Sequence, residues 1–149
     1  MPTSKFRLQS VLDYRQTLID TARLELSGLH IRCAEEETLL WSLRASERQV
    51  IADLSEQQRV IVNMPDVMRL NEHLNVLGRR IGNQWSAVQR IRGEIERVQS
   101  TLIELTKAAK ALEKLKERHV QEVALYAMRL ERAETGEIAA RQHQMAVVR

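Results

Sequence analysis

The sequence has few of the residues that build a compact globular core. Its 149 residues include one cysteine, two prolines and five glycines, and aromatic residues make up 3% of the chain. A lone cysteine excludes an internal disulfide and a cysteine-based zinc cluster, so Cys33 is expected to be a small buried hydrophobe. Ala, Leu, Glu, Lys, Arg and Gln dominate instead, as they do in long helices.

Long apolar runs are also lacking. No stretch approaches the roughly 20 residues that span a bilayer, and the N-terminus has no apolar signal segment. We therefore expect a cytoplasmic protein without direct membrane insertion. The net charge of +3 divides into −1 for residues 1–62 and +4 for residues 63–149. This mild polarity indicates solvated helix faces and not the dense basic arm of a nucleic-acid binder.

A heptad repeat dominates the second half of the chain. With spacings of three and four residues, apolar side chains occupy one register from Val67 to Val147, which predicts a long helix with one narrow apolar stripe that needs a partner helix. The stripe consists of Val67, Leu70, Leu74, Leu77, Ile81, Val88, Ile91, Ile95, Val98, Leu102, Leu105, Ala109, Leu112, Val123, Tyr126, Leu130, Ala133, Ala140 and Val147.

A second heptad register precedes it, from Leu8 to Ile61. Asn63-Met64-Pro65-Asp66 interrupts the pattern, because Pro65 lacks an amide hydrogen and disfavours a helical conformation at Met64. We expect Thr3 or Ser4 to cap the first helix, Asn63 to end it in a left-handed conformation and Asp66 to cap the second. The predicted fold is all-α, a single coiled-coil domain over 1–149 with helix one at about 4–62, a turn at 63–66 and helix two at about 67–145.

So short a turn requires an antiparallel hairpin. Centring it on Pro65-Asp66 pairs Cys33 with Val98 and leaves two polar layers. The remaining apolar layers are Ile61/Leu70, Leu54/Leu77, Val50/Ile81, Leu43/Val88, Leu40/Ile91, Leu29/Leu102, Leu26/Leu105, Ala22/Ala109, Ile19/Leu112 and Leu8/Val123, and the polar ones are Glu47/Gln84 and Arg15/Lys116. Tyr126 then faces Lys5, so the second helix protrudes beyond this point as a C-terminal end with a free apolar edge.

Catalytic and metal-binding patterns are missing. His30, His73, His119 and His143 belong to no HExxH or Cys/His cluster, and the glycines form no phosphate-binding loop. His119 and Glu122 lie one turn apart, but a seam-edge pair explains them better than a metal site does. We expect no enzyme, no cofactor and no metal.

Interaction surfaces are the better candidates. Two sets of side chains lie off or beside the heptad stripe, one near the turn and one near the paired termini. Flanking positions of the stripe and a methionine cap on the turn are the alternative explanation for the first set. The turn-side set comprises Trp41, Ile51, Val60, Val62, Met64, Met68, Val76 and Trp85; near the termini, Leu24 and Ile31 form a smaller apolar stripe and Lys114, Lys116, Arg118, Arg129 and Arg132 a basic one.

Both ends of the chain carry recognisable motifs. FRLQSVLDYR at residues 6–15 and ALEKLKERH at residues 111–119 resemble segments of the FliJ family of flagellar export proteins, and the length and single central turn agree. The D-E-x-A ending common in that family is replaced by Gly136-Glu137-Ile138-Ala139, which lacks the aspartate.

The resemblance implies a stalk of the flagellar type III export apparatus, similar to the shaft of rotary ATPases. Such a stalk inserts into the export ATPase hexamer, promotes its assembly, contacts the membrane export gate, binds export chaperones and associates peripherally with the inner membrane. The resemblance assigns ATPase binding to Phe6, Arg7, Leu8, Tyr14, Arg15, Lys114, Lys116 and Arg118. It assigns contact with the export gate to Trp41, Ile51, Val62, Met64, Met68, Val76 and Trp85. For the stalk, the residues leave the flagellar system and the related virulence-secretion system both open. A nucleic-acid-binding coiled-coil arm and a self-associating structural coiled coil are the alternatives.

Overall fold

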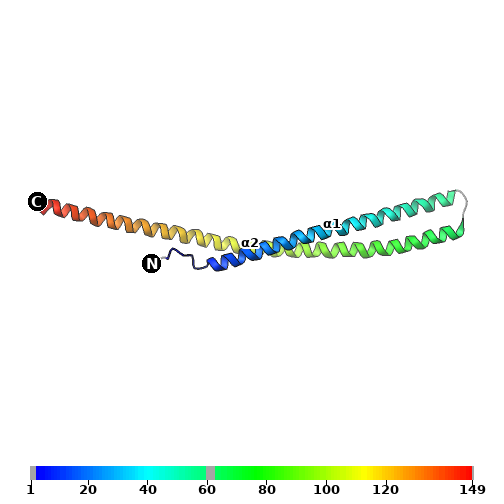
Figure 1. The fold of residues 1–149 in the computed structure, drawn as a ribbon, viewed down its shortest axis with the longest axis horizontal. Helices are drawn as coiled ribbons and strands as arrows, with labels where there is room; N and C mark the ends of the chain where they lie inside the picture. Colours follow the sequence, from blue (N-terminus) through cyan, green and yellow to red (C-terminus); the bar gives the residue numbers. More distant parts are fainter. Residues whose placement is uncertain (1–2, 60–62, 149) are drawn as a thin grey trace. The chain divides into compact units, whose positions relative to one another are not determined.

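The computed structural model describes residues 3–59 and 63–148, and two long helices account for nearly all of them. Helix α1 runs over Gln9–Arg59 and helix α2 over Met64–Val148, with no strand in the described ranges (Figure 1). The predicted all-α hairpin is thereby confirmed. Val60, Ile61 and Val62, and with them the predicted layer Ile61/Leu70, lie outside the described residues.

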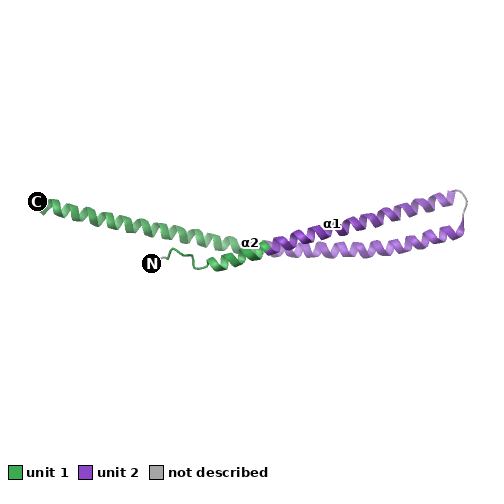
Figure 2. Ribbon diagram, in the orientation of Figure 1, with its two compact units in different colours: residues 1–20, 103–149 green, residues 21–102 purple. Residues whose placement is uncertain are grey.

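Contacts divide the chain into two compact units (Figure 2). Unit 1 combines Met1–Asp20 with Ile103–Arg149, and unit 2 is Thr21–Leu102. In unit 2, α1 and α2 run antiparallel on either side of the chain reversal. In unit 1, the first turns of α1 accompany part of α2, and α2 then continues alone.

The core is the narrow seam that the heptad pattern predicts. Val88 is the most buried of the described side chains, with 1% of its surface exposed. Every buried hydrophobic residue among those described occupies an a or d position, which the sequence pattern identified: Leu12, Ile19, Ala22, Leu29, Cys33, Leu40, Val50, Leu77, Val88, Ile91, Ile95 and Ala109. From Ala127 to Val148 all residues are exposed, so the apolar edge beyond Tyr126 is free as expected.

The helix ends differ from their predicted positions. Helix α1 begins at Gln9, later than expected, because residues 3–8 form turns: the Gln9 amide donates to the Phe6 carbonyl (3.2 Å) and the Leu12 amide to Leu8 (3.0 Å). Thr3 is not a helix cap, and its hydroxyl donates to the Lys5 carbonyl.

Helix α2 begins earlier than expected, at Met64. Pro65 lies in its first turn, where a missing amide hydrogen removes no helical hydrogen bond. The Asn63 carbonyl accepts from the Val67 amide (3.1 Å), so Asn63 caps α2 and does not end α1 in a left-handed conformation; no described residue has positive φ. Asp66 is within the helix and pairs with Arg69.

The alignment of the two helices also differs from the predicted one. In unit 2, Leu29, Cys33, Ile91 and Ile95 form one cluster, with Leu26 and Val98 packed against it. In an antiparallel pair this cluster consists of the layers Cys33/Ile91, Leu29/Ile95 and Leu26/Val98. The observed register is therefore shifted by one heptad from the predicted layers, because the chain reverses before Pro65 and not at it.

The polar layers change accordingly. The Gln84 side-chain amide does not meet Glu47; it donates to the Glu36 carbonyl (2.9 Å) and to the Glu36 carboxylate. In unit 1 the ring of Phe6 lies 5.8 Å from that of His119, which is again about one heptad from the predicted alignment. The same shift places Arg15 at the level of Ala109, so the predicted Arg15/Lys116 layer does not form.

Candidate functional sites on the helix surfaces

The terminal surface comprises Phe6, Arg7, Leu8, Tyr14, Arg15, Lys114, Lys116 and Arg118, and all eight lie in unit 1. Arg7, Lys114 and Arg118 are exposed, and Tyr14 exposes 62% of its surface. Arg15 and Lys116 are half-buried, since they occupy d and a positions whose alkyl chains cover the seam. Lys114 and Arg118 are four residues apart, so both project from neighbouring turns of α2.

One contact in this region was not anticipated from the sequence. The Phe6 ring, on the segment before α1, packs against His119 of α2 at a tilt of 46°. The His119 Nε2 is buried without a hydrogen-bond partner. A sequence pattern offered little signal for the pair, because Phe6 precedes the helix and its heptad register does not apply there.

The turn-side surface comprises Trp41, Ile51, Met64, Met68, Val76 and Trp85, and it lies in unit 2; Val62, also predicted there, is outside the described residues. Trp41 exposes 71% and Trp85 50% of its surface, while Val76 is half-buried beside the seam. The Arg48 guanidinium lies 5.7 Å from the centre of the Trp41 ring, within range of a cation–π contact. Two exposed tryptophans on one two-helix unit resemble the large aromatic anchors of protein interfaces.

A polar cluster joins the helices beside the seam. Arg92 donates to Glu37 across the pair (2.7 Å), and the Cys33 thiol donates to the same carboxylate oxygen (3.5 Å). The Arg92 hydrogen bond lowers the pKa of Glu37, and that bond raises the pKa of Arg92. Burial, followed by the neighbouring Glu37 carboxylate, raises the pKa of the Cys33 thiol. The cysteine is therefore a neutral, packed side chain and not an activated nucleophile.

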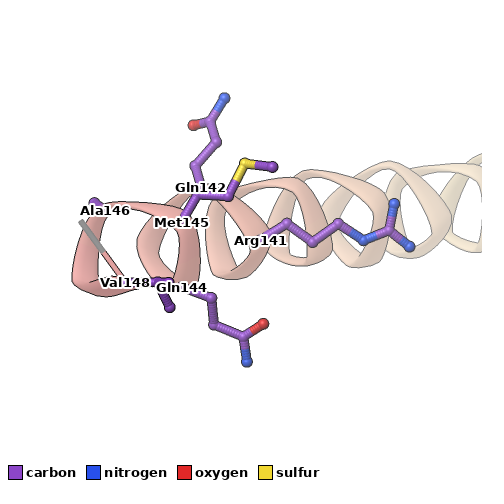
Figure 3. Close-up of a pocket in the computed structure, with 6 residues that line it drawn as sticks. All are labelled: Arg141, Gln142, Gln144, Met145, Ala146 and Val148. Atoms are coloured by element: carbon purple, nitrogen blue, oxygen red, sulfur yellow. The ribbon is translucent and has the colours of Figure 1, made fainter.

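The end of α2 carries a shallow surface hollow. Its lining comprises Arg141, Gln142, Gln144, Met145, Ala146 and Val148. Figure 3 shows these side chains spreading around a single helix, with Gln142 and Gln144 pointing in opposite directions. They do not converge on a common point, so the hollow offers no ligand site.

Residues 3–59 and 63–148 include no group of three or more His, Cys, Asp or Glu side chains that could hold a metal ion. Within the same ranges, neither helix has a segment apolar and long enough to cross a membrane. The arrangement presents exposed side chains along its helix faces, where other macromolecules could contact them.

The fold and these surfaces define the class: an antiparallel two-helix coiled coil whose exposed aromatic and charged residues are its candidate sites. A family model described as the Flagellar FliJ protein matches residues 4–147, nearly the whole chain. The chain belongs to the FliJ family, and its role is related to flagellum biogenesis and protein export. No curated protein and no solved structure matches it.

Proposed function

We propose that this protein is a non-enzymatic stalk and adaptor of the flagellar type III export apparatus. In this role its terminal surface inserts into the ring of the export ATPase hexamer and promotes ring assembly and activity. Its turn-side surface contacts the membrane export gate, and its helix faces bind export chaperones. The protein is then cytoplasmic and held at the inner membrane through its partners.

The observation that supports the proposal most is membership of the FliJ family over residues 4–147, together with the location of the two motif-bearing segments in one unit. Residues 6–15 and 111–119 are far apart in sequence, and unit 1 contains both. The exposed cations of unit 1 suit polar contacts with the ATPase hexamer, whereas the exposed tryptophans of unit 2 suit an interface from which water is excluded.

Stimulation of the ATPase tests the terminal surface. Replacing the exposed residues Arg7, Lys114 and Arg118 with glutamate should abolish the increase in ATP hydrolysis by the cognate export ATPase. Each glutamate would repel the acidic group of the ATPase that the original cation attracts. Reversal at Arg79 and Arg80, exposed residues of unit 2, is the matched control and should preserve stimulation. Circular dichroism should show equal helicity in both variants.

Full stimulation of ATP hydrolysis by the terminal variant would contradict the assignment of this surface.

Self-association is the second candidate function, favoured by the apolar side chains exposed along both helices, such as Leu24, Ile31 and Ile103. Sedimentation that depends on concentration would support it. Nucleic-acid binding has less support, because the basic residues of α2 alternate with Glu94, Glu104, Glu113 and Glu117; a shift of labelled RNA at low salt would be its positive result.

A further inference from the structure

A second stripe of uncharged residues runs along the part of α1 in unit 2, on the side that faces away from α2. Its members follow spacings of three and four residues, as those of the seam do, and all of them are exposed. The three large ones each expose 60% or more of their surface. This outer stripe comprises Leu24, Ser27, Ile31, Ala34, Thr38 and Trp41. A helix with a heptad stripe on each of two sides can pack against a helix on each side.

Two hollows lie in succession along the outer stripe and meet at Ala34. The first contains Ser27, His30, Ile31 and Ala34, and the second contains Ala34, Glu37, Thr38 and Trp41. In both, the four residues follow the spacing i, i+3, i+4 and i+7, which is the hole that receives one side chain of a facing helix in a coiled coil. The outer stripe therefore has the shape of a helix-packing surface as well as its pattern.

Polar groups in the outer stripe do not oppose its burial at Thr38. The Thr38 hydroxyl donates to the Ala34 carbonyl within α1 (2.8 Å). Covering Thr38 with another helix therefore leaves this hydroxyl with a partner, so the cost of removing water from it is small. The Thr38 methyl group remains available for packing.

The outer stripe can pair with the same stripe of a second copy. In a parallel, in-register pair, identical residues face one another, so Leu24 meets Leu24 and Ile31 meets Ile31. Ile31 of each copy then enters the first hollow of the other, and Thr38 enters the second. Each layer of this pairing is free of charge, so the stripe is complementary to itself.

The residues beside the outer stripe favour the parallel orientation. In a parallel pair, a residue on one flank lies near the residue five positions later on the opposite flank of the other copy, which brings His30 to Glu35 twice. The other flanking pairs are Arg23/Gly28, Glu37/Ser42 and Arg44/Gln49. An antiparallel pair would instead bring the two Glu35 side chains together and Arg23 to Arg44, and such like charges repel.

We propose that the outer stripe is the interface of a parallel dimer, in which α1 of one copy lies in register beside α1 of a second copy. Only three side chains per copy are large, so the contact is smaller than the standard interface of about 1,600 Å² and the dimer is weak and reversible. Trp41 also belongs to the turn-side surface, so a partner bound through Trp41 competes with the second copy. The inference goes beyond the stalk role and does not depend on it.

Sedimentation velocity of the full-length protein, from low micromolar to several hundred micromolar, tests the interface. The native protein should shift from monomer to dimer across this range. Ile31→Arg should abolish the shift, because two arginines then face one another in the stripe. Ile103→Arg is the matched control, since Ile103 is an exposed isoleucine of unit 1, and it should preserve the shift. Circular dichroism should show equal helicity in all three proteins.

A monomer at every concentration overturns the proposal and removes self-association as a candidate function. A dimer that Ile31→Arg leaves unchanged overturns the interface alone, because the copies then associate through other residues. Neither result bears on stimulation of the export ATPase, which the charge-reversal variants test separately.

Disulfide cross-linking tests the orientation. With Cys33 replaced by alanine throughout, Thr38→Cys chains should form disulfide dimers under mild oxidation several-fold faster than Ser46→Cys chains. Ser46 is exposed on α1 outside the outer stripe, so it reports random collisions. A mixture of Ser27→Cys and Thr38→Cys chains tests the antiparallel pair, which sets these two positions against each other. Mixed disulfides that form faster than the Thr38→Cys dimer overturn the parallel arrangement; non-reducing gels and mass spectrometry distinguish the products.

Discussion

Individual seam residues contribute the stability of this protein, because a two-helix core has few layers of packing. Val88 is the most buried of the described side chains and lies on α2 in unit 2. Val88→Ala removes two methyl groups from the seam and leaves a cavity, which should lower the free energy of unfolding by about 2 kcal/mol. Urea unfolding followed by circular dichroism measures the change.

Leu24→Ala is the control for that experiment, since Leu24 exposes 77% of its surface. Its effect should stay within about 0.5 kcal/mol. Equal destabilisation by both substitutions would contradict the burial of Val88 in the seam between the helices.

The Glu37 carboxylate makes the free energy of unfolding depend on pH. Its pKa is lower in the folded protein than in the unfolded chain because Arg92 donates a hydrogen bond to it. The unfolded state therefore binds more protons between the two pKa values, so this contribution is present above the unfolded pKa and is lost as pH falls through the folded one. The thermal midpoint of the native protein should fall on acidification through this window.

Glu37→Gln should reduce the slope of the thermal midpoint against pH. Added salt should also reduce this slope in the native protein, because the Glu37–Arg92 pair is exposed. Glu96→Gln, a change at an exposed carboxylate of α2, serves as the control. A slope that Glu37→Gln and Glu96→Gln reduce equally would indicate general charge effects and not this pair.

At the scale of the helix, α2 has a packed part and an unpacked part. Gly28 of α1 and Gly136 of α2 both have helical backbones, and an added Cβ would meet no atom within 4 Å at either. Gly28→Ala lies within unit 2, so it should raise the free energy of unfolding by about 0.5–1 kcal/mol. Gly136→Ala lies where all side chains are exposed, so it should increase helicity without moving the cooperative transition.

Far-ultraviolet circular dichroism measures the helicity, and urea unfolding measures the transition. An equal shift of the transition by Gly136→Ala would show that residues 127–148 unfold together with the seam. That result would require a contact for this segment that the described residues do not make.

For the whole molecule, the two candidate surfaces should act independently because they belong to different units. Replacing both Trp41 and Trp85 with alanine should abolish binding to the purified cytoplasmic domain of the export gate protein, since it removes the two largest exposed aromatic side chains. Stimulation of the export ATPase should be unchanged in this variant. Calorimetric titration and ATP hydrolysis assays provide the two readouts.

Leu24→Ala with Ile31→Ala is the matched control, because these residues are exposed apolar side chains outside the turn-side surface. Gate binding that survives loss of both tryptophans would contradict the turn-side assignment. Loss of ATPase stimulation in the tryptophan variant would show that the two surfaces are not independent.

The sequence predicts the helices and their buried faces well. Each residue from Leu12 to Ala109 that is buried follows from the heptad phase, and the free edge beyond Tyr126 follows from the unequal helix lengths. The phase does not determine which heptad faces which. That choice depends on where the chain reverses, and Pro65 is compatible with a helix start as well as with a turn. The Phe6–His119 contact was missed for a related reason, since residues 3–8 follow no helical period.

Every heptad of the seam has the same length and the same phase, so a hairpin of this kind can be shortened by whole heptads. Deleting seven consecutive residues from α1 and seven from the facing stretch of α2 leaves every remaining a and d residue on its inner face. A chain shortened by residues 26–32 and 92–98 would lose Leu29 and Ile95 together and keep both Trp41 and Trp85, yet its seam would close again around Cys33 and Ile91. The length of a hairpin of this kind can thus be altered in steps of seven residues without changing which face of each helix lines the seam.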